Sequence, residues 1–323
     1  RLLGLFHSCA MERRLVLLIF FVSGASGLVY EVVWMRMITN VMGSSVYAVS
    51  TVLAAFMGGL AIGGALIGRI ADRGWNGLHL YAVLEFGVAS WALLLPGALE
   101  LAEEFYVGAA SGFGGYSLPF RFLLSLALLL PPTILMGGTL PALAKFLVKG
   151  GHAAGFEIGG LYWANTIGAA LGCFAAGFLF IHALGLPFTN ALAAAGNAAA
   201  GVGALLLGRR SSVRSRSASG PSEAAEASSA LSPHSVPAWL TLTAIGISGF
   251  TALAYEVLWT RLLSTIFINT AYSFAAMLTV FLVGIAIGSV MTSLTVARWR
   301  RLLFLFGLAE GAVAFHLDWV QPD

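Results

Sequence analysis

Two short motifs place a glutamate inside long apolar runs, where a charged side chain is costly. They read YEVVWMR at 30–36 and YEVLWTR at 255–261. Ionisable residues within membrane segments must face protein or water, and they often mark ion pathways or proton relays. The motifs therefore predict that Glu31 and Glu256 bind a cation or relay protons. The alternative is that each glutamate pairs with a neighbouring helix and fixes packing. The tyrosines that precede them are also candidates: Tyr30 and Tyr255.

A second candidate is the stretch LPPTILMGGTLP at 130–141, which interrupts an apolar segment with prolines and glycines. Prolines within a membrane helix free backbone carbonyls from their helical partners. This pattern predicts a broken helix, and broken helices often line transporter sites. The alternative is a kink that neighbouring helices satisfy. The candidate residues are Pro131, Pro132, Thr133 and Thr139.

The loop sequence GRIADRG at 68–74 carries an acid between two arginines. Arg69, Asp72 and Arg73 could form a charge network that closes the cytoplasmic side in one conformation. The alternative is an ordinary basic cytoplasmic loop with a turn, because Lys and Arg gather on that side of a membrane.

Glycines that are four residues apart allow two helices to approach closely. Packing is the preferred explanation for four such pairs: Gly59 with Gly63, Gly64 with Gly68, Gly168 with Gly172, and Gly284 with Gly288.

Enzyme chemistry has little support in the sequence. The six histidines are scattered, and neither a nucleophile triad nor a phosphate-binding loop is recognisable. The two cysteines, Cys9 and Cys173, suggest neither a disulfide framework nor a metal cluster. We therefore expect no catalytic residue, no metal site and no cofactor.

The elements that hold these residues are predicted to be membrane helices. Hydrophobic residues make up 59% of the 323 positions and charged residues 10%, with a mean hydropathy of +0.90. Apolar runs long enough to cross a bilayer, which takes about 20 helical residues, recur along the chain. Nine helices are expected, near 15–38, 45–70, 78–99, 119–148, 157–184, 187–207, 238–264, 270–296 and 302–320.

Basic residues fall at alternate helix ends and predict the orientation of the helices. Clusters at 13–14, 69–73, 145–149, 209–216 and 298–301 share one side, whereas acids at 100–104 lie on the other. Because Lys and Arg accumulate on the cytoplasmic side, we expect a multi-pass protein of the cell inner (plasma) membrane with a cytoplasmic N-terminus. The net charge of +3 then reflects topology and does not indicate a nucleic-acid partner; the expected partner is the lipid bilayer.

The sequence repeats itself after a shift of 225 positions. Without a gap, the shift places Glu31 on Glu256 and Glu85 on Glu310, together with further polar and aromatic matches. Glu85 and Glu310 lie nearer the cytoplasmic helix ends, and we expect them to serve packing. Six helices separate the copies, so both have the same orientation, as in the two halves of major facilitator transporters. The expected parts are a six-helix half at 11–208, a disordered cytoplasmic linker at 209–237, and the start of a second half at 238–323.

Four stretches resemble a known family. SGASGLVYEVVWMR, AAFMGGLAIGGALIGRIADR, LPPTILMGGTLPALAK and LYWANTIGAALGCFAAGF resemble the membrane region of the bacterial fused major-facilitator/spermidine-synthase-like proteins. The resemblance covers 15 to about 310. It implies a separate or fused aminopropyltransferase domain as partner, and that catalytic domain is not recognisable in this chain.

The combined prediction is an all-α, polytopic, major-facilitator-like membrane protein that transports or senses a small cationic solute such as a polyamine. The polyamine rests on the resemblance alone. The alternative is a non-catalytic membrane domain of a spermidine-synthase-like aminopropyltransferase fusion. Because the second half has about three helices instead of six, we expect a truncated fragment that does not transport by itself.

Overall fold

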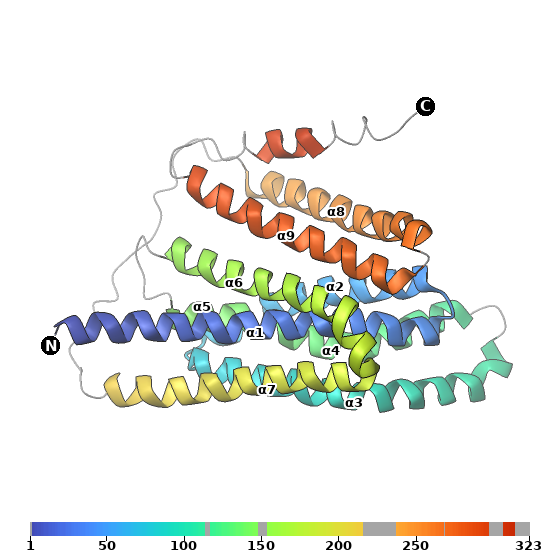
Figure 1. The fold of residues 1–323 in the computed structure, drawn as a ribbon, viewed down its shortest axis with the longest axis horizontal. Helices are drawn as coiled ribbons and strands as arrows, with labels where there is room; N and C mark the ends of the chain where they lie inside the picture. Colours follow the sequence, from blue (N-terminus) through green and yellow to red (C-terminus); the bar gives the residue numbers. More distant parts are fainter. Residues whose placement is uncertain are drawn as a thin grey trace.

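The computed structural model of the protein is helical throughout the part that it describes, which comprises residues 2–113, 117–147, 154–215, 237–267, 269–296 and 306–313 (Figure 1). The all-α prediction is confirmed. The long helices are α1 (Leu2–Met42), α2 (Ser45–Asp72), α3 (Gly77–Phe113), α4 (Ser117–Gly137), α5 (Thr139–Leu147), α6 (Ala154–Ala175), α7 (Ile181–Ser215), α8 (Ala238–Phe267) and α9 (Thr270–Val296), with a π-helical turn, η2, at Ala176–Phe180.

Seven apolar helical stretches are long enough to cross a membrane, as judged by length and composition among the described residues. The longest, Glu157–Arg209, contains two of the expected helices. The chain bends within it at Gly185, where φ is 76° and only glycine is comfortable, shortly before Pro187. Helix α7 continues to Ser215, into the expected linker, and 216–236 lie outside the described residues. Of the expected helix at 302–320, only 306–313 are described, and they are helical.

Asparagine side chains cap the N-terminal ends of two helices. The side-chain oxygen of Asn76 accepts hydrogen bonds from the amides of Leu78 and His79 at 3.0 and 3.4 Å, which caps α3. Asn269 caps α9 in the same way, through the amides of Ala271 and Tyr272 at 2.9 and 3.4 Å.

Helix α1 lies at the centre of the bundle, between α6 and α7, and it packs most closely on α6 (Figure 1). A Cβ atom at Gly168 or Gly172 of α6 would collide with the backbone of Phe21 or Ala25 of α1. In α2, Cβ atoms at Gly59 and Gly63 would collide with α4. The packing prediction for these two glycine pairs is therefore confirmed.

The other two glycine pairs differ from them. Gly64 and Gly68 are at ordinary contact distance from α4 and α5, with nearest atoms at 3.7 and 3.9 Å from the ideal Cβ positions. At Gly284 and Gly288 of α9, no atom lies within 4 Å, so the close approach predicted there is wrong for this structure. The physical reason is that this face of α9 is not covered by another described helix.

Helices α8 and α9 lie side by side along one flank of the first bundle (Figure 1). Helix α9 packs on α6 and η2, whereas α8 packs mainly on α9. Large apolar side chains of α8 are exposed, as shown by Trp239, Leu242 and Phe250 at 67%, 70% and 76%. A membrane would cover such a surface with lipid, because lipid tails are as apolar as these side chains.

Candidate functional site

The two repeated glutamates are buried inside the protein. Glu31 of α1 and Glu256 of α8 are each 2% exposed. In each carboxyl group, Oε1 has no hydrogen-bond partner among the described residues. Buried polar atoms are nearly always hydrogen-bonded, so an unpartnered carboxyl oxygen at both repeat positions requires an explanation.

The structure brings these two carboxyl groups together from distant parts of the sequence. Glu31 and Glu256 lie within electrostatic range of each other, and Cys173 of α6 lies within range of both. The Cys173 thiol donates to the Ala275 carbonyl of α9 at 3.5 Å, and Gly177 of η2 packs directly on Ala275. The site therefore forms where α1, α6 with η2, α8 and α9 meet, between the repeat-related segments.

Tyr30 faces away from this acidic pair. Its ring stacks on Trp34, with centroids 4.8 Å apart and planes inclined by 20°. Its buried hydroxyl has no partner among the described residues and lies within electrostatic range of Glu85 in α3. The repeat-related Tyr255 is only half-buried, so the two tyrosines are not equivalent in this structure.

The sequence analysis missed the role of Glu85 as the centre of a buried polar cluster. Ser23 of α1 donates to Glu85 Oε1 at 2.6 Å, and Asn197 of α7 donates to Oε2 at 2.5 Å. In the second copy, Ser248 donates to Glu310 Oε1, also at 2.6 Å. The signal was present in the sequence, because a Ser and a Glu 62 residues apart recur in both copies.

A second polar layer joins the same three helices two turns away. The indole nitrogen of Trp34 donates to Asn190 Oδ1 at 3.0 Å, and Asn190 Nδ2 donates to the Ala92 carbonyl at 2.6 Å. Asn190 and Asn197 are seven residues apart on α7, so both side chains face the interface with α1 and α3. Interhelical hydrogen bonds of this kind fix the register of membrane helices.

The expected broken helix is interrupted at Gly138, between α4 and α5. Pro131 and Pro132 lie inside α4. The hydroxyl of Thr133 donates to the Ala55 carbonyl of α2 at 3.0 Å and to Leu129 of its own helix at 2.9 Å. Thr139 donates to the Met136 carbonyl at 2.6 Å. Both hydroxyls donate hydrogen bonds to backbone carbonyls. This favours the interpretation of the stretch as a kink whose carbonyl groups find partners in the surrounding protein. A role in solute binding stays a prediction.

The three expected gating residues do not meet in this structure. Arg69, Asp72 and Arg73 are exposed at the end of α2. One guanidinium nitrogen of Arg69 lies 3.4 Å from the Ala65 carbonyl, and the backbone of Arg73 donates to the Ile70 carbonyl. Their charge network stays a prediction about another conformation.

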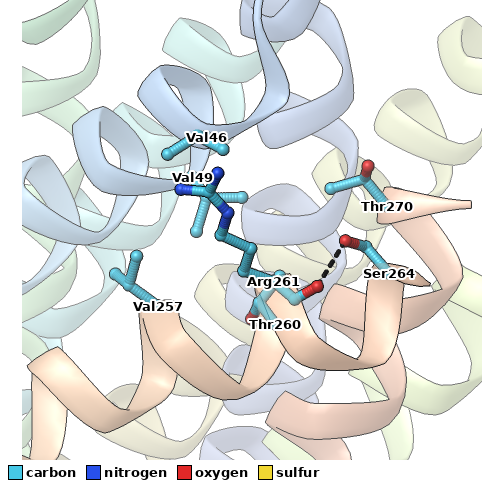
Figure 2. A pocket seen from close by; sticks show the side chains of 7 residues that line it. All are labelled: Val46, Val49, Val257, Thr260, Arg261, Ser264 and Thr270. Carbon is cyan, nitrogen blue, oxygen red and sulfur yellow. Dashed lines mark hydrogen bonds between the residues drawn. The ribbon is translucent and has the colours of Figure 1, made fainter. Parts of the chain in front are cut away.

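A pocket opens one turn beyond Glu256, between the start of α2 and the end of α8 (Figure 2). Figure 2 shows the Arg261 side chain extending from α8 toward Val46 and Val49 of α2. The full lining is Val46, Val49, Val257, Thr260, Arg261, Ser264 and Thr270. This pocket combines apolar walls with one cation, at the edge of the same interface that buries Glu256.

Metal chemistry has no support in the described part of the chain, where no group of three or more His, Cys, Asp or Glu side chains could hold an ion. The described residues also form no strand, so they include no sheet of a methyltransferase-like catalytic fold.

Comparison with known proteins gives one weak relative. No family model matches the chain. Polyamine aminopropyltransferase 2 of Streptomyces coelicolor is 31% identical over 201 residues, which are 62% of this chain and 35% of that protein. The chain therefore matches about a third of the length of this relative. This match supports the resemblance to spermidine-synthase-like proteins over 62% of the chain.

Proposed function

We propose that this protein binds a small organic cation, such as a polyamine, between its two repeat-related segments and transports or senses it. The observation that carries the proposal is the pair Glu31 and Glu256. Both are buried at 2% exposure, both have an unpartnered Oε1, and each is within electrostatic range of the other.

A cation is the natural occupant because two neighbouring carboxylates repel each other when ionised. Each charge at the centre of a membrane helix costs about 2.5–3.5 kcal/mol without a partner. A solute with two ammonium groups would neutralise both carboxylates and donate to both free oxygens. Since one carboxylate belongs to α1 and the other to α8, such a solute would bridge segments that move relative to each other in repeat-built transporters.

The relative supports polyamine as the solute class, because its name places it in polyamine chemistry. It also favours a second candidate function, a membrane domain that accompanies an aminopropyltransferase. A continuous stretch of 201 residues in a chain of 323 must include 123–201, wherever it begins. This region forms α4 to α7, so the matched part of the relative resembles apolar helices, while most of the relative lies outside the match.

The proposed setting is a bacterial inner membrane, with the N-terminus and the linker near 209–237 in the cytoplasm. The basic helix ends support this orientation. In the same proposal, Arg69, Asp72 and Arg73 close the cytoplasmic side when the solute site faces outward.

Equilibrium binding of radiolabelled spermidine to the 323-residue protein in lipid nanodiscs tests the proposal. We expect Glu31→Gln and Glu256→Gln each to weaken binding on the order of tenfold or more, since each removes ~1.4 kcal/mol or more of charge pairing. Glu157→Gln is the matched control, because Glu157 forms a half-buried ion pair with Arg13 far from the site. Absence of spermidine binding by the parent protein would refute cation binding and leave the membrane-domain function as the better explanation.

A further inference from the structure

The Glu85 cluster lies on a different face of α1 from the acidic pair and is not used by the proposed function. Glu85 is fully buried among α1, α3 and α7. Its two carboxyl oxygens accept hydrogen bonds from Ser23 and Asn197 at 2.6 and 2.5 Å. The hydroxyl of Tyr81, one turn earlier on α3, lies beside the same carboxyl group. All of these neighbours are neutral.

Two buried polar oxygens beside Glu85 have no partner among the described residues. They are the hydroxyl of Tyr30, on a side chain that is 0% exposed, and Oδ1 of Asn197, on a side chain that is 2% exposed. Both side chains approach Glu85, since Tyr30 lies within electrostatic range of it and Asn197 is hydrogen-bonded to it. Since a tyrosine hydroxyl can both donate and accept, these two oxygens show that at least one hydrogen bond is left unmade beside Glu85.

Among the described residues, the charged side chains of the other helices packed on α3 lie elsewhere. Arg121 of α4, for example, lies beside Gly43 at the end of α1. Helices α4 and α5 also pack on α3. At the level of Gly87, α4 presents the apolar side chain of Leu135. On α5, Lys145 donates to the Ala71 carbonyl at the end of α2 instead of reaching into the cluster. The described groups that face Glu85 from α1 and α7 are the neutral Ser23, Tyr30 and Asn197.

We propose that Glu85 carries an exchangeable proton, and that its protonated form donates a hydrogen bond to the Tyr30 hydroxyl oxygen. Protonation forms one O–H bond on the carboxyl group with a proton taken from water, and release returns this proton to water. A neutral carboxyl group removes the uncompensated charge from the membrane interior and supplies a donor for the Tyr30 oxygen. Ser23 and Asn197, which donate to the two carboxyl oxygens, stabilise the ionised form in turn, so the proton can leave.

The site is independent of Glu31 and Glu256, although the same helix carries both. Tyr30 faces Glu85, whereas the next residue, Glu31, faces Glu256. A change of protonation at Glu85 would therefore act on one face of α1 and solute binding on the other. This arrangement would couple proton uptake to the position of α1, and thus supply a proton as the driving ion.

Infrared difference spectroscopy of the protein in lipid, between about pH 4 and pH 10 to span carboxyl and phenol groups, tests the proposal. The Glu31→Gln/Glu256→Gln double variant serves as the background, so that the outcome does not depend on the acidic pair. We expect a pH-dependent C=O stretching band of a protonated carboxyl group that Glu85→Gln removes. Glu85→Asp should move the band, which keeps the test valid if the glutamine variant fails to fold.

Two further variants separate an exchanging group from a structural one. Tyr30→Phe should shift the band to higher frequency, because it removes the oxygen that accepts the carboxyl hydrogen bond. Glu310→Gln is the matched control, since its Ser248 pair has the same 2.6 Å hydrogen bond at an exposed position, and it should leave the band unchanged. A band that survives Glu85→Gln, or a Glu85 band that stays constant across the pH range, would overturn the proposal.

Discussion

Substitution of Gly172 by alanine probes the contact that brings α1 against α6. A Cβ atom at Gly172 would lie 2.7 Å from both the carbonyl carbon and the Cα of Ala25, and nearer still to the carbonyl oxygen. These are backbone atoms, so no flexible side chain can move aside, and the two helices must separate locally. Overpacking of this kind costs about 1–3 kcal/mol.

The matched control lies on the same helix. Gly159 has no atom within 4 Å of its Cβ position. Alanine is favoured over glycine in a helix by about 1 kcal/mol at either position. The propensity gain therefore cancels between the two variants, and the difference in unfolding free energy isolates the overpacking cost of about 1–3 kcal/mol.

Reversible unfolding in mixed micelles, with increasing SDS, measures both variants against the parent. We expect Gly159→Ala to be at least as stable as the parent and Gly172→Ala to be clearly less stable than Gly159→Ala. Because Cys173 follows Gly172 directly and lies in range of Glu31 and Glu256, spermidine binding should weaken in the same variant. Equal stability of the two alanine variants would refute the close contact between α1 and α6.

Three further predictions address other parts of the structure. Asn190→Ala should lower the unfolding free energy by about 1–3 kcal/mol, since it leaves the buried indole N–H of Trp34 without an acceptor; the same SDS titration measures it. Cys173 is buried, so in a Cys9→Ser background a maleimide should label the protein only after denaturation, and rapid labelling of the native variant would contradict the packing of α6 on α9. In spheroplasts, a cysteine at Glu103 should be accessible from outside and one at 219 protected, and the reverse pattern would refute the proposed orientation.

The helices could be predicted because a membrane helix is a long run of apolar residues, which can be recognised in the sequence alone. Apolar runs interrupted by Gly and Pro indicated α2, α8 and α9 to within three residues, since lipid-facing and core-facing sides are both apolar. Helix α1 begins 13 residues earlier and α3 ends 14 residues later than expected. The bend at Gly185, within α7, agrees with the expected end of one helix at 184 and start of the next at 187. The π-helical turn at Ala176–Phe180 was not, because it depends on how α9 packs beside it and not on a local residue preference.

The site was only partly predictable, because it depends on how helices that are far apart in the sequence pack together. The repeat identified Glu31 and Glu256 as a pair, but their proximity depends on how α8 packs against the first bundle. Glu85 was assigned to packing because one sequence does not show which helices surround it. Its partner Asn197 lies on α7, 112 residues away, so no local pattern connects them.

The stretch from Glu157 to Arg209 has a consequence for how the protein enters its membrane. These 53 residues contain no polar loop, and a straight helix of this length would measure about 80 Å, far beyond a hydrocarbon core of about 30 Å. The chain instead turns back at Gly185 (Figure 1). Insertion must therefore deliver α6 and α7 together, as a preformed hairpin, with no hydrophilic segment to carry across.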